Sequence, residues 1–424
     1  MNASVDIQGT PRQHLDQQTL LDELQLKIAL RVEGLSFDPQ ELKTLPIGSE
    51  YAEQVHLLFD MDKEHHDGFE LPSTFWLPHG LQVAFRWDPE SRYRLRVIGG
   101  QPSIEYWGNE GHRPLGNIEF YKRPHLNDYQ TRDGEHFDHI AAFSPEGGVQ
   151  VFFSNECDLK HTGEDCKYCN INSTADAYRS QNIFLKSPGQ VAEVYATAFK
   201  EGLANHINLT GGFIPERREV DYYLDIAEEI KERTGLEEIY GTAVIGAPLD
   251  LSVIDKYKEA GYKTLAINLE IWNQHIFKAI CPGKDRRSGG WAHWVKALEY
   301  AAQVFGPGRV RSNIVAGIEP KESILEGVEH LASKGVIAYA GAWCPNPGSA
   351  LEGHRSPEPS WHYDLTLKVA ALHRKYGFTT EQLYSGSGAS GPYHDAFRIL
   401  NGEHQGDRLV QYRHPLLVPA PALV

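Results

Sequence analysis

The chain has 424 residues, of which 57 are acidic and 41 are Lys or Arg, so its formal charge at pH 7 is −16. Hydrophobic residues make up 41% of the sequence and aromatic residues 11%, which is enough for a large core and excludes a chain that is disordered as a whole. Because the balance of charge is acidic, neither nucleic acid nor an anionic membrane is expected as a partner. The five cysteines are too few for a disulfide scaffold at this length.

The N-terminal segment, residues 1–18, is polar and lacks the cationic and apolar regions of a secretory signal. No run of about 18 apolar residues occurs, so no transmembrane helix is expected. We therefore expect a cytoplasmic protein, in which thiols stay reduced. Cysteines that gather in such a protein indicate a metal site rather than disulfides.

Residues 1–140 are expected to form a small α+β domain. A helical pattern covers residues 20–32, and four short aromatic and β-branched segments between 81 and 121 predict one small antiparallel sheet. The polar stretch 123–136 predicts a linker.

From residue 149 onward, short apolar runs alternate with helical patterns. The expected strands are 149–154, 206–211, 238–244, 264–270, 309–317 and 336–342. The expected helices are 191–201, 220–234, 252–260, 291–304, 323–334 and 362–376. This alternation predicts an α/β fold, a full or partial (β/α) TIM-type barrel over residues 145–378, followed by a C-terminal extension, 379–424. In such barrels the functional groups lie at the C-terminal ends of the strands.

The strongest chemical signal is a group of three cysteines. Cys157, Cys166 and Cys169 lie within 13 residues, in a loop that begins where the first expected barrel strand ends. Thiolates hold iron–sulfur clusters, which normally take four of them, so three would leave one iron open to a ligand from outside the protein. The alternatives are a zinc site, in which His161 would supply the fourth ligand, and chance clustering.

The segment GEDCKYC, with Tyr168 before its last cysteine, resembles the cluster loop of radical S-adenosylmethionine (SAM) enzymes, especially the branch of biotin synthase and the FeFe-hydrogenase maturases. Those relatives carry CxxxCxxC. In this chain Thr162 stands four positions before Cys166, and the first cysteine is Cys157, which makes the motif Cx8CxxC. The departure lengthens the loop and keeps all three thiolates.

Further segments support the resemblance over residues 149–378, and in the family they contact SAM. Glycines at the end of the second strand let the backbone approach the methionine amino group. An amide and a carboxylate after the fourth strand hold the ribose hydroxyls, and the fifth strand contacts adenine. The cofactor-binding residues that the resemblance implies are Tyr168, Gly211, Gly212, Asn268, Glu270, Val315 and Gly317. Residues 345–349 are similar to the Pro-rich turn after the sixth strand.

The resemblance implies a 4Fe–4S cluster on the three cysteines, with SAM on the fourth iron. One electron, from a donor such as flavodoxin or ferredoxin, would split SAM into methionine and a 5′-deoxyadenosyl radical that abstracts hydrogen from a small organic substrate. The expected outcome is rearrangement, cleavage or carbon–carbon bond formation. Sulfur or methyl transfer is the alternative within the class, and a non-catalytic metal-binding barrel is the alternative outside it.

Biotin synthase inserts sulfur from a second cluster, which is held by strand cysteines and an arginine. The matching positions here are Asn208, a residue near Tyr240 or Gly241, and Arg311. None of them is a cysteine, so sulfur insertion of that type is not expected.

The two remaining cysteines differ in their position. Cys344, just past the sixth strand, is the candidate catalytic residue, because a thiol at the barrel mouth would donate a hydrogen atom to a product radical or bind substrate. The alternative is a small buried residue, a common role of free cysteine. Cys281 is expected to pack at a helix end.

For three other patterns we expect a structural role rather than a catalytic or binding one. The GxGxxG at 386–391 lacks room for a nucleotide-binding βαβ unit and predicts a loop that closes over the barrel mouth. The histidine-rich pieces 65–67 and 136–139 are expected at the surface or in the core rather than on a metal. Arg286 and Arg287 are expected to be a solvated pair, with an anionic substrate group as the alternative.

Overall fold

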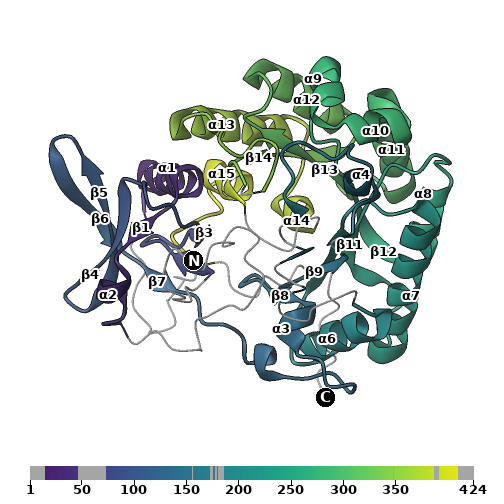
Figure 1. Ribbon diagram of the computed structural model, residues 1–424, viewed down its shortest axis with the longest axis horizontal. Coiled ribbons are helices and arrows are strands. Elements are labelled where there is room, and N and C mark those ends of the chain that lie inside the picture. The colour runs from purple at the N-terminus through teal and green to yellow at the C-terminus, as the bar shows by residue number, and fades with distance from the viewer. Residues whose placement is uncertain are drawn as a thin grey trace.

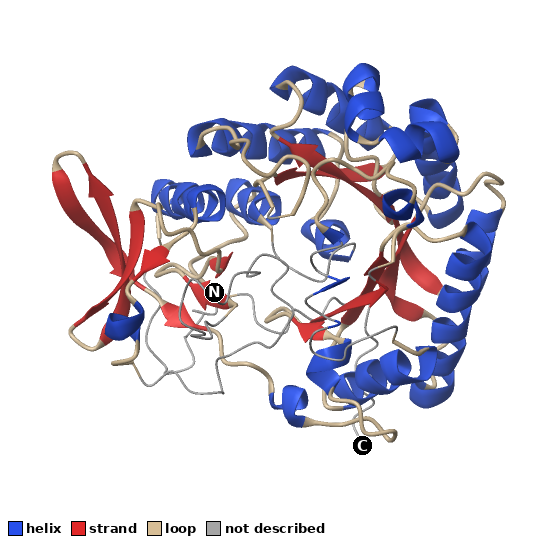
Figure 2. Ribbon diagram, viewed as in Figure 1, coloured by secondary structure: helices blue, strands red, loops and turns tan. Residues whose placement is uncertain are grey.

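The computed structural model describes residues 15–45, 73–154, 156–171, 175–176, 179, 186–346, 348–385 and 391–408. A curved parallel sheet with helices on its outer face forms the larger part (Figures 1 and 2). Two small sheets and helices from both ends of the chain lie beside its concave side.

The parallel sheet has the strand order β14-β13-β12-β11-β10-β9-β8, so consecutive strands are neighbours. Its parallel strands are β9 (Gly148–Ser154), β10 (His206–Gly211), β11 (Ile239–Ile245), β12 (Tyr262–Ile267), β13 (Val310–Ala316) and β14 (Val336–Ala342). The short β8 (Ala142–Phe143) pairs antiparallel with β9 at one edge. Because β14 and β8 are open edges, the sheet is a partial barrel, as the sequence predicts.

Helices cover the sheet in the order expected for β/α units. They are α6 (Pro188–Lys200), α7 (Glu216–Thr234), α8 (Val253–Glu259), α11 (Gly290–Phe305), α12 (Lys321–Ser333) and α13 (Pro359–Lys375). Local signals set their ends: Ser187 and Gln190 form a capping box at the start of α6, and Gly235 ends α7 in a left-handed conformation. All six strands and all six helices expected between residues 149 and 376 are present.

Among the helices that the structure describes in this part, three short ones were not expected: α4 (Asp158–His161), α9 (Gln274–Ile280) and α10 (Pro282–Arg287). The last two fill the connection between β12 and α11, and Cys281 stands between them with no solvent exposure. The expected packing of Cys281 at a helix end is therefore confirmed. Helices of one or two turns carry too few residues for a 3.6-residue period to be recognised.

The expected single sheet in the front part is wrong, because the structure has two. One is β1-β4-β5-β6 and the other is β3-β2-β7. The strands are β1 (Ser36–Phe37), β2 (Thr74–Trp76), β3 (Gln82–Ala84), β4 (Tyr93–Ile98), β5 (Gln101–Gly108), β6 (Gly111–Asn117) and β7 (Glu119–Phe120). Strand β4 pairs in parallel with the distant β1, and β2 pairs with both β3 and β7. Local hydrophobic patterns do not specify such non-local pairings.

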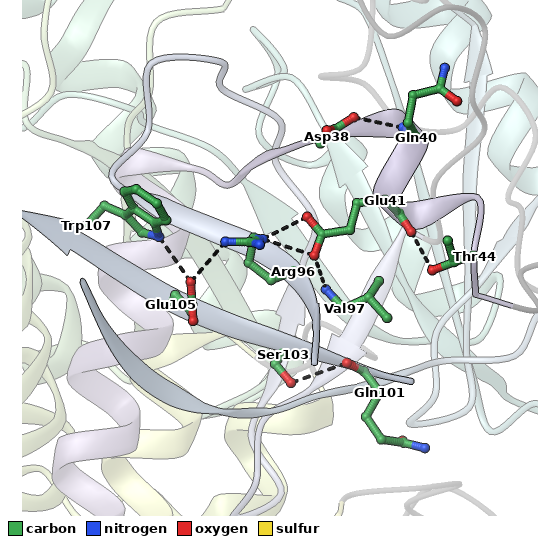
Figure 3. A network of polar contacts seen from close by, with 10 residues as sticks. All are labelled: Asp38, Gln40, Glu41, Thr44, Arg96, Val97, Gln101, Ser103, Glu105 and Trp107. Atoms are coloured by element: carbon green, nitrogen blue, oxygen red, sulfur yellow. Dashed lines mark hydrogen bonds and ion pairs between the residues drawn. The ribbon is translucent and has the colours of Figure 1, made fainter. Parts of the chain in front are cut away.

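A polar network ties the first sheet to the short helix α2 (Pro39–Leu42) (Figure 3). Arg96 donates to Glu41 at 2.7 Å and to Glu105 at 3.3 Å, and Glu105 also accepts from the indole of Trp107 at 3.1 Å. Glu41 further accepts from the backbone N–H of Val97 at 2.7 Å. Because Arg96 is partly exposed, its ion pairs contribute little to the stability of the fold. The main effect of the network is to fix the orientation of α2.

A hydrophobic core distinct from that of the barrel joins the two ends of the chain to the last barrel units. Residues from α1 (Gln17–Glu33), the front sheets, β14, α13 and α15 (Pro392–Leu400) pack together in it. Within it Lys27 of α1 and Asp395 of α15 form a buried ion pair at 2.6 Å. Residues on both sides of the domain boundaries expected near residues 140 and 378 thus pack in one core. Among the described residues no helix is both long and apolar enough to cross a membrane.

Buried histidines in this region make stability depend on pH. Burial lowers the pKa of His373 and of His362 to about 4 and that of His394 to about 3, from a usual value of 6.5. Between these values the unfolded chain binds protons that the folded chain does not. Stability is therefore lost as the pH falls from about 6.5 to 4, by up to about 1.4 kcal/mol per pH unit for each histidine.

We expect His373→Gln to make the acid loss of unfolding free energy smaller, by roughly 1 kcal/mol or more. Urea unfolding followed by circular dichroism at several pH values measures this loss. His354→Gln, at an exposed position, is the control and should leave the pH dependence of the parent chain unchanged. Identical pH profiles for His373→Gln and the parent would contradict the prediction.

Candidate active site

The three clustered cysteines lie in one loop at the C-terminal edge of the parallel sheet. Cys157 precedes α4, and Cys166 and Cys169 follow it, all three as partly buried free thiols. The backbone N–H of Asp158 donates to the carbonyl of Phe213, just past β10, at 2.7 Å. The loop is thus tied to the neighbouring strand end, where a barrel of this kind places its functional groups.

Gly212 sets how closely the cysteine loop approaches β10. A Cβ atom on Gly212 would lie 2.0 Å from the carbonyl oxygen of Glu156 and 2.7 Å from the side chain of Ile171. A Cβ on Gly211 would lie 2.8 Å from the ring of Phe153. These glycines therefore make room for the cysteine loop and its supporting strand. Their expected contact with SAM remains a prediction.

The junction of α9 and α10 holds the same loop from the other side. The N–H of Gly283 donates to the carbonyl of Glu164 at 2.9 Å, and the N–H of Lys167 donates to the carbonyl of Ile280 at 2.9 Å. A Cβ on Gly283 would lie 2.5 Å from the Glu164 carbonyl oxygen, so close approach again requires glycine.

Arg286 and Arg287 also bind the cysteine loop. Arg286 pairs with Glu164 at 2.9 Å, and Arg287 donates to the hydroxyl of Thr162 at 2.7 Å. Both guanidinium groups are exposed to solvent, as expected. The sequence did not predict that each of them also has a partner in the cysteine loop. These contacts support the loop and do not point to the anionic substrate group considered from the sequence.

The thiols lie in a crowded and largely buried environment. A hydrogen bond between the thiols of Cys281 and Cys166 lowers the pKa of Cys166 and raises that of Cys281. Burial, together with the neighbouring Cys166 and Cys157, raises the pKa of Cys169 to about 12. Cys157, Cys166 and Cys169 therefore lie near one another, and a cationic metal centre among them would favour their thiolate forms.

Glu270 lies beside these thiols in a strained backbone conformation. Its φ is 74°, the only positive φ of a non-glycine residue within the described ranges. The backbone hydrogen bonds from Glu270 N–H to Asn313 O (2.9 Å) and from Val315 N–H to Glu270 O (2.8 Å) hold it in place. Such outliers concentrate at functional sites, where the surrounding structure holds the strain.

Lys284, which the sequence analysis did not select, holds this segment electrostatically. Its ammonium donates to the carbonyl of Asn268 at 2.7 Å and to the carboxylate of Glu270 at 3.2 Å, and it lies 4.3 Å from the ring centre of Trp294. Burial opposes its charge, but Glu270 and the thiol of Cys166 outweigh this effect, so the pKa of Lys284 is raised. No sequence pattern marked this residue, because the helix α10 that carries it was not expected.

The amide side chain of Asn268 is oriented by the next strand, since its oxygen accepts from the N–H of Asn313 at 3.1 Å. Val315 lies on β13, whereas Gly317 follows that strand with a φ of 117°. A Cβ on Gly317 would lie 2.8 Å from Pro357, so the loop packing already requires glycine there.

A cavity of about 550 Å³ opens on the concave side of the sheet. Its walls come from β9, β10, β13 and β14, from α1 and the segment around β3, and from α13 and α15. Tyr168, Glu270, Val315 and Cys344 line it, so four of the residues selected from the sequence face one space. Its size is typical of small-molecule sites.

Two cavity residues from the front of the chain, Arg31 and Arg86, were also not selected. Arg31 lies in α1, and its carbonyl accepts from the thiol of Cys344 at 3.3 Å. Arg86 follows β3 and donates to the carbonyl of Val32 at 2.6 Å. Only the tertiary packing brings these segments to the mouth of the barrel.

Several patterns noted in the sequence lie outside the described residues. They are residues 386–390 of the GxGxxG, the histidine-rich piece 65–67, and Pro347 of the turn after β14. Gly391, the last residue of the GxGxxG, lines the cavity at the start of α15. In the piece 136–139, His139 pairs with Glu135 at 2.6 Å.

The donor set fits an iron–sulfur cluster. In the described part of the chain, no three His, Cys, Asp or Glu side chains converge as ligands of a single metal ion. The fit rests on donor chemistry: three thiols on one loop are the soft ligands that Fe–S clusters take, beside a cavity that reaches Tyr168 and Glu270.

Residues 151–331 match the family model described as the Radical SAM superfamily. The chain is 27% identical over 311 residues to the bacteriochlorophyllide c C-7(1)-hydroxylase of Chlorobaculum limnaeum, and the match covers 70% of this chain and 76% of that protein.

Two solved structures resemble the fold at a distance. Methylornithine synthase has a TM-score of 0.42 and 15% identity, covering 64% of this chain and 78% of its own. The FeFe-hydrogenase maturase HydG from Carboxydothermus hydrogenoformans has a TM-score of 0.42 and 17% identity, covering 56% of this chain and 55% of its own.

The fold and the family match define the class: the partial barrel is a radical SAM domain. Residues 151–331 form this radical SAM domain, and the protein is an enzyme whose cofactors are a 4Fe–4S cluster and SAM. The non-catalytic barrel considered from the sequence is thereby set aside.

We expect Gly212→Ala to displace the cysteine loop, because the added Cβ would collide with the Glu156 carbonyl. The substitution should cost about 1–3 kcal/mol of stability and most of the iron bound after anaerobic reconstitution, measured by iron analysis and visible absorption. Gly189→Ala, in helix α6 with only Arg233 nearby at 3.7 Å, is the matched control and should load iron normally. Full iron loading of Gly212→Ala would contradict this role of the glycine.

Proposed function

We propose that this radical SAM enzyme abstracts a hydrogen atom from a small organic substrate held in the cavity on the concave face of the sheet. The observation that carries the proposal is the continuity of that cavity. It reaches Tyr168 and Glu270, next to the cysteine loop, and extends to Cys344 and to Arg31 of the front helix. A substrate in this space would lie within reach of a radical formed beside the cysteines.

The chain's own residues divide the work of binding the cofactors. Cys157, Cys166 and Cys169 would hold the cluster through their thiolates. When bound, the cluster and SAM supply one-electron cleavage of the sulfonium and a 5′-deoxyadenosyl radical that takes hydrogen from carbon. Asn268 and Glu270 would accept hydrogen bonds from the ribose hydroxyls, and Lys284, which donates to the Glu270 carboxylate, holds it in place.

Val315 would pack against the adenine from β13, and Tyr168 would stand between the cysteine loop and the cavity. Gly211, Gly212 and Gly317 would contribute backbone rather than side-chain contacts. The proposed small-molecule substrate and an electron donor such as flavodoxin or ferredoxin are the partners this chemistry requires.

The front of the chain has a role in shielding this space. Arg31, Ala84, Phe85 and Arg86 line the cavity from the front part of the chain. Their packing would keep water and stray hydrogen donors from a radical, as closed active sites do.

We expect reconstituted protein with SAM and a reductant to form 5′-deoxyadenosine, and Cys166→Ala to reduce this product to the background of cluster-free protein. Liquid chromatography with mass detection measures the product, and iron analysis measures loading. Cys344→Ala, a matched cysteine change outside the cluster loop, should retain both. Fully loaded protein that forms no 5′-deoxyadenosine, with or without candidate substrates, would sink the proposal.

Cys344 is proposed as the catalytic residue that donates a hydrogen atom to the product radical, because its thiol is half-buried, lines the cavity and is oriented by the Arg31 carbonyl. One electron from the electron donor and one proton from solvent would return the resulting thiyl radical to the thiol. A thiol donates a hydrogen atom to a carbon radical far more readily than a hydroxyl does. We therefore expect Cys344→Ala and Cys344→Ser to cleave SAM yet to lose product formation. Unaltered product formation in Cys344→Ala would leave Cys344 as a packing residue.

A second candidate function follows from the hydroxylase that this chain resembles. Replacement of C–H by C–OH at a macrocycle substituent also begins with removal of that hydrogen, so the same residues would serve. SAM, reduced to methionine and 5′-deoxyadenosine, would be the two-electron oxidant, and water would supply the oxygen. Incubating the reconstituted enzyme with a bacteriochlorophyllide, and following its mass and absorption, separates this candidate from reactions on smaller substrates. Sulfur and methyl transfer would be recognised by the same product masses.

A further inference from the structure

Arg311 is a buried cation at the floor of the cavity. It is the second residue of β13, its exposed fraction is 8%, and it is among the residues that line the cavity. One guanidinium nitrogen, Nη2, donates to the side-chain oxygen of Asn208 at 2.9 Å. The buried Nε has no hydrogen-bond partner among the described residues.

The titratable groups that face Arg311 from neighbouring elements carry no compensating negative charge. They are Tyr339 of β14 and Tyr393 and His394 of α15. The guanidinium lies 5.9 Å from the ring centre of Tyr339, which stacks on Tyr393 at 4.3 Å. Arg31 acts electrostatically on the same Tyr393, so a second cation lies near this part of the cavity.

Three other buried cations among the described residues are paired with carboxylates. Lys27 pairs with Asp395 at 2.6 Å, Lys284 with Glu270 at 3.2 Å, and Arg398 with Asp407 at 3.5 Å. The described residues place no such carboxylate on Arg311, and burial alone lowers the pKa of its guanidinium. A buried charge without a counter-charge is costly, which indicates that a ligand supplies the missing anion.

The position of Arg311 separates it from the expected SAM site. Three residues of β13 lie between it and Val315, so the two Cα atoms are four residue steps, about 13 Å, apart at the usual strand rise. The cysteine loop and Glu270 belong to the C-terminal edge of the sheet, whereas Arg311 stands near the start of its strand. The anion therefore belongs to the substrate rather than to SAM.

We propose that Arg311 and Asn208 form a carboxylate-binding subsite that anchors the substrate at the floor of the cavity, with Arg31 adding positive potential. The proposal rests on the proposed function in that the anchored molecule is the one that loses hydrogen. A planar guanidinium with free donors matches the two oxygens of a carboxylate, and a neutral amide beside it adds selectivity without adding charge. Anchoring a substrate at its carboxylate would direct another carbon of it toward the C-terminal edge of the sheet, where the radical forms.

The test uses the reconstituted holoenzyme and sodium propionate as the probe, at up to about 50 mM and at ionic strength matched with chloride. We expect propionate to raise the melting temperature by about 1 °C or more, and neutral propionamide to leave it unchanged. In Arg311→Met the apparent Kd for propionate should rise at least about 30-fold. Arg217→Met, at an exposed position of α7, is the matched control and should respond like the parent.

A second readout separates a ligand subsite from a structural role. Without propionate, Arg311→Met should melt at or above the temperature of the parent, because it removes an uncompensated buried charge. A lower melting temperature combined with an intact response to propionate would make Arg311 structural and overturn the proposal. Equal stabilisation by propionamide, or none by propionate in the parent, would do the same.

Inorganic phosphate at the same ionic strength completes the experiment. Stabilisation by phosphate and not by propionate, again lost in Arg311→Met, would overturn the carboxylate assignment in favour of a phosphorylated substrate. Because these measurements need no SAM turnover, they can succeed where 5′-deoxyadenosine formation fails. The two proposals are therefore tested separately.

Discussion

The close approach of Gly212 to the carbonyl oxygen of Glu156 is the constraint on which the rest of the site depends. At this distance only a hydrogen atom fits, so the cysteine loop lies directly on the end of β10. Gly283 allows the same approach from the helical connection after β12. Two glycines on different β/α units thus set the position of all three thiols. The side chains of Arg286 and Arg287 then hold the outer part of the loop.

Buried charge organises the cavity beneath this loop. Lys284 and Glu270 compensate each other close to the thiols, at a strained backbone position that the proposed function assigns to ribose binding. Arg311, at the other end of β13, lacks such a partner among the described residues. The two ends of the cavity therefore differ in charge compensation. At one end Lys284 and Glu270 neutralise each other within the protein, and at the other the substrate carboxylate would neutralise Arg311.

A partial barrel has open edges, and here the ends of the chain cover its concave side. Helix α1, the segment around β3 and helix α15 contribute to the cavity walls and share a core with β14 and α13. The buried Lys27–Asp395 pair joins the two terminal segments, so the cover is integral to the fold. The thiol of Cys344 meets α1 at this boundary, which links the cover to the proposed hydrogen-donor step.

The sequence by itself determined the order of the six β/α units, the radical SAM class and the three clustered thiols, because hydrophobic period and motif spacing are local properties. Tyr168, Glu270 and Val315 could be selected because the segments that carry them resemble those of radical SAM enzymes. Cys344 could be selected because it follows a strand end of the expected barrel. Only the tertiary structure decided the two front sheets and the roles of Lys284, Arg31 and Arg311. The sheets depend on pairing between strands far apart in the chain, and the roles of the charged residues depend on which of them are paired with an opposite charge when buried. Neither property produces a periodic pattern in the sequence.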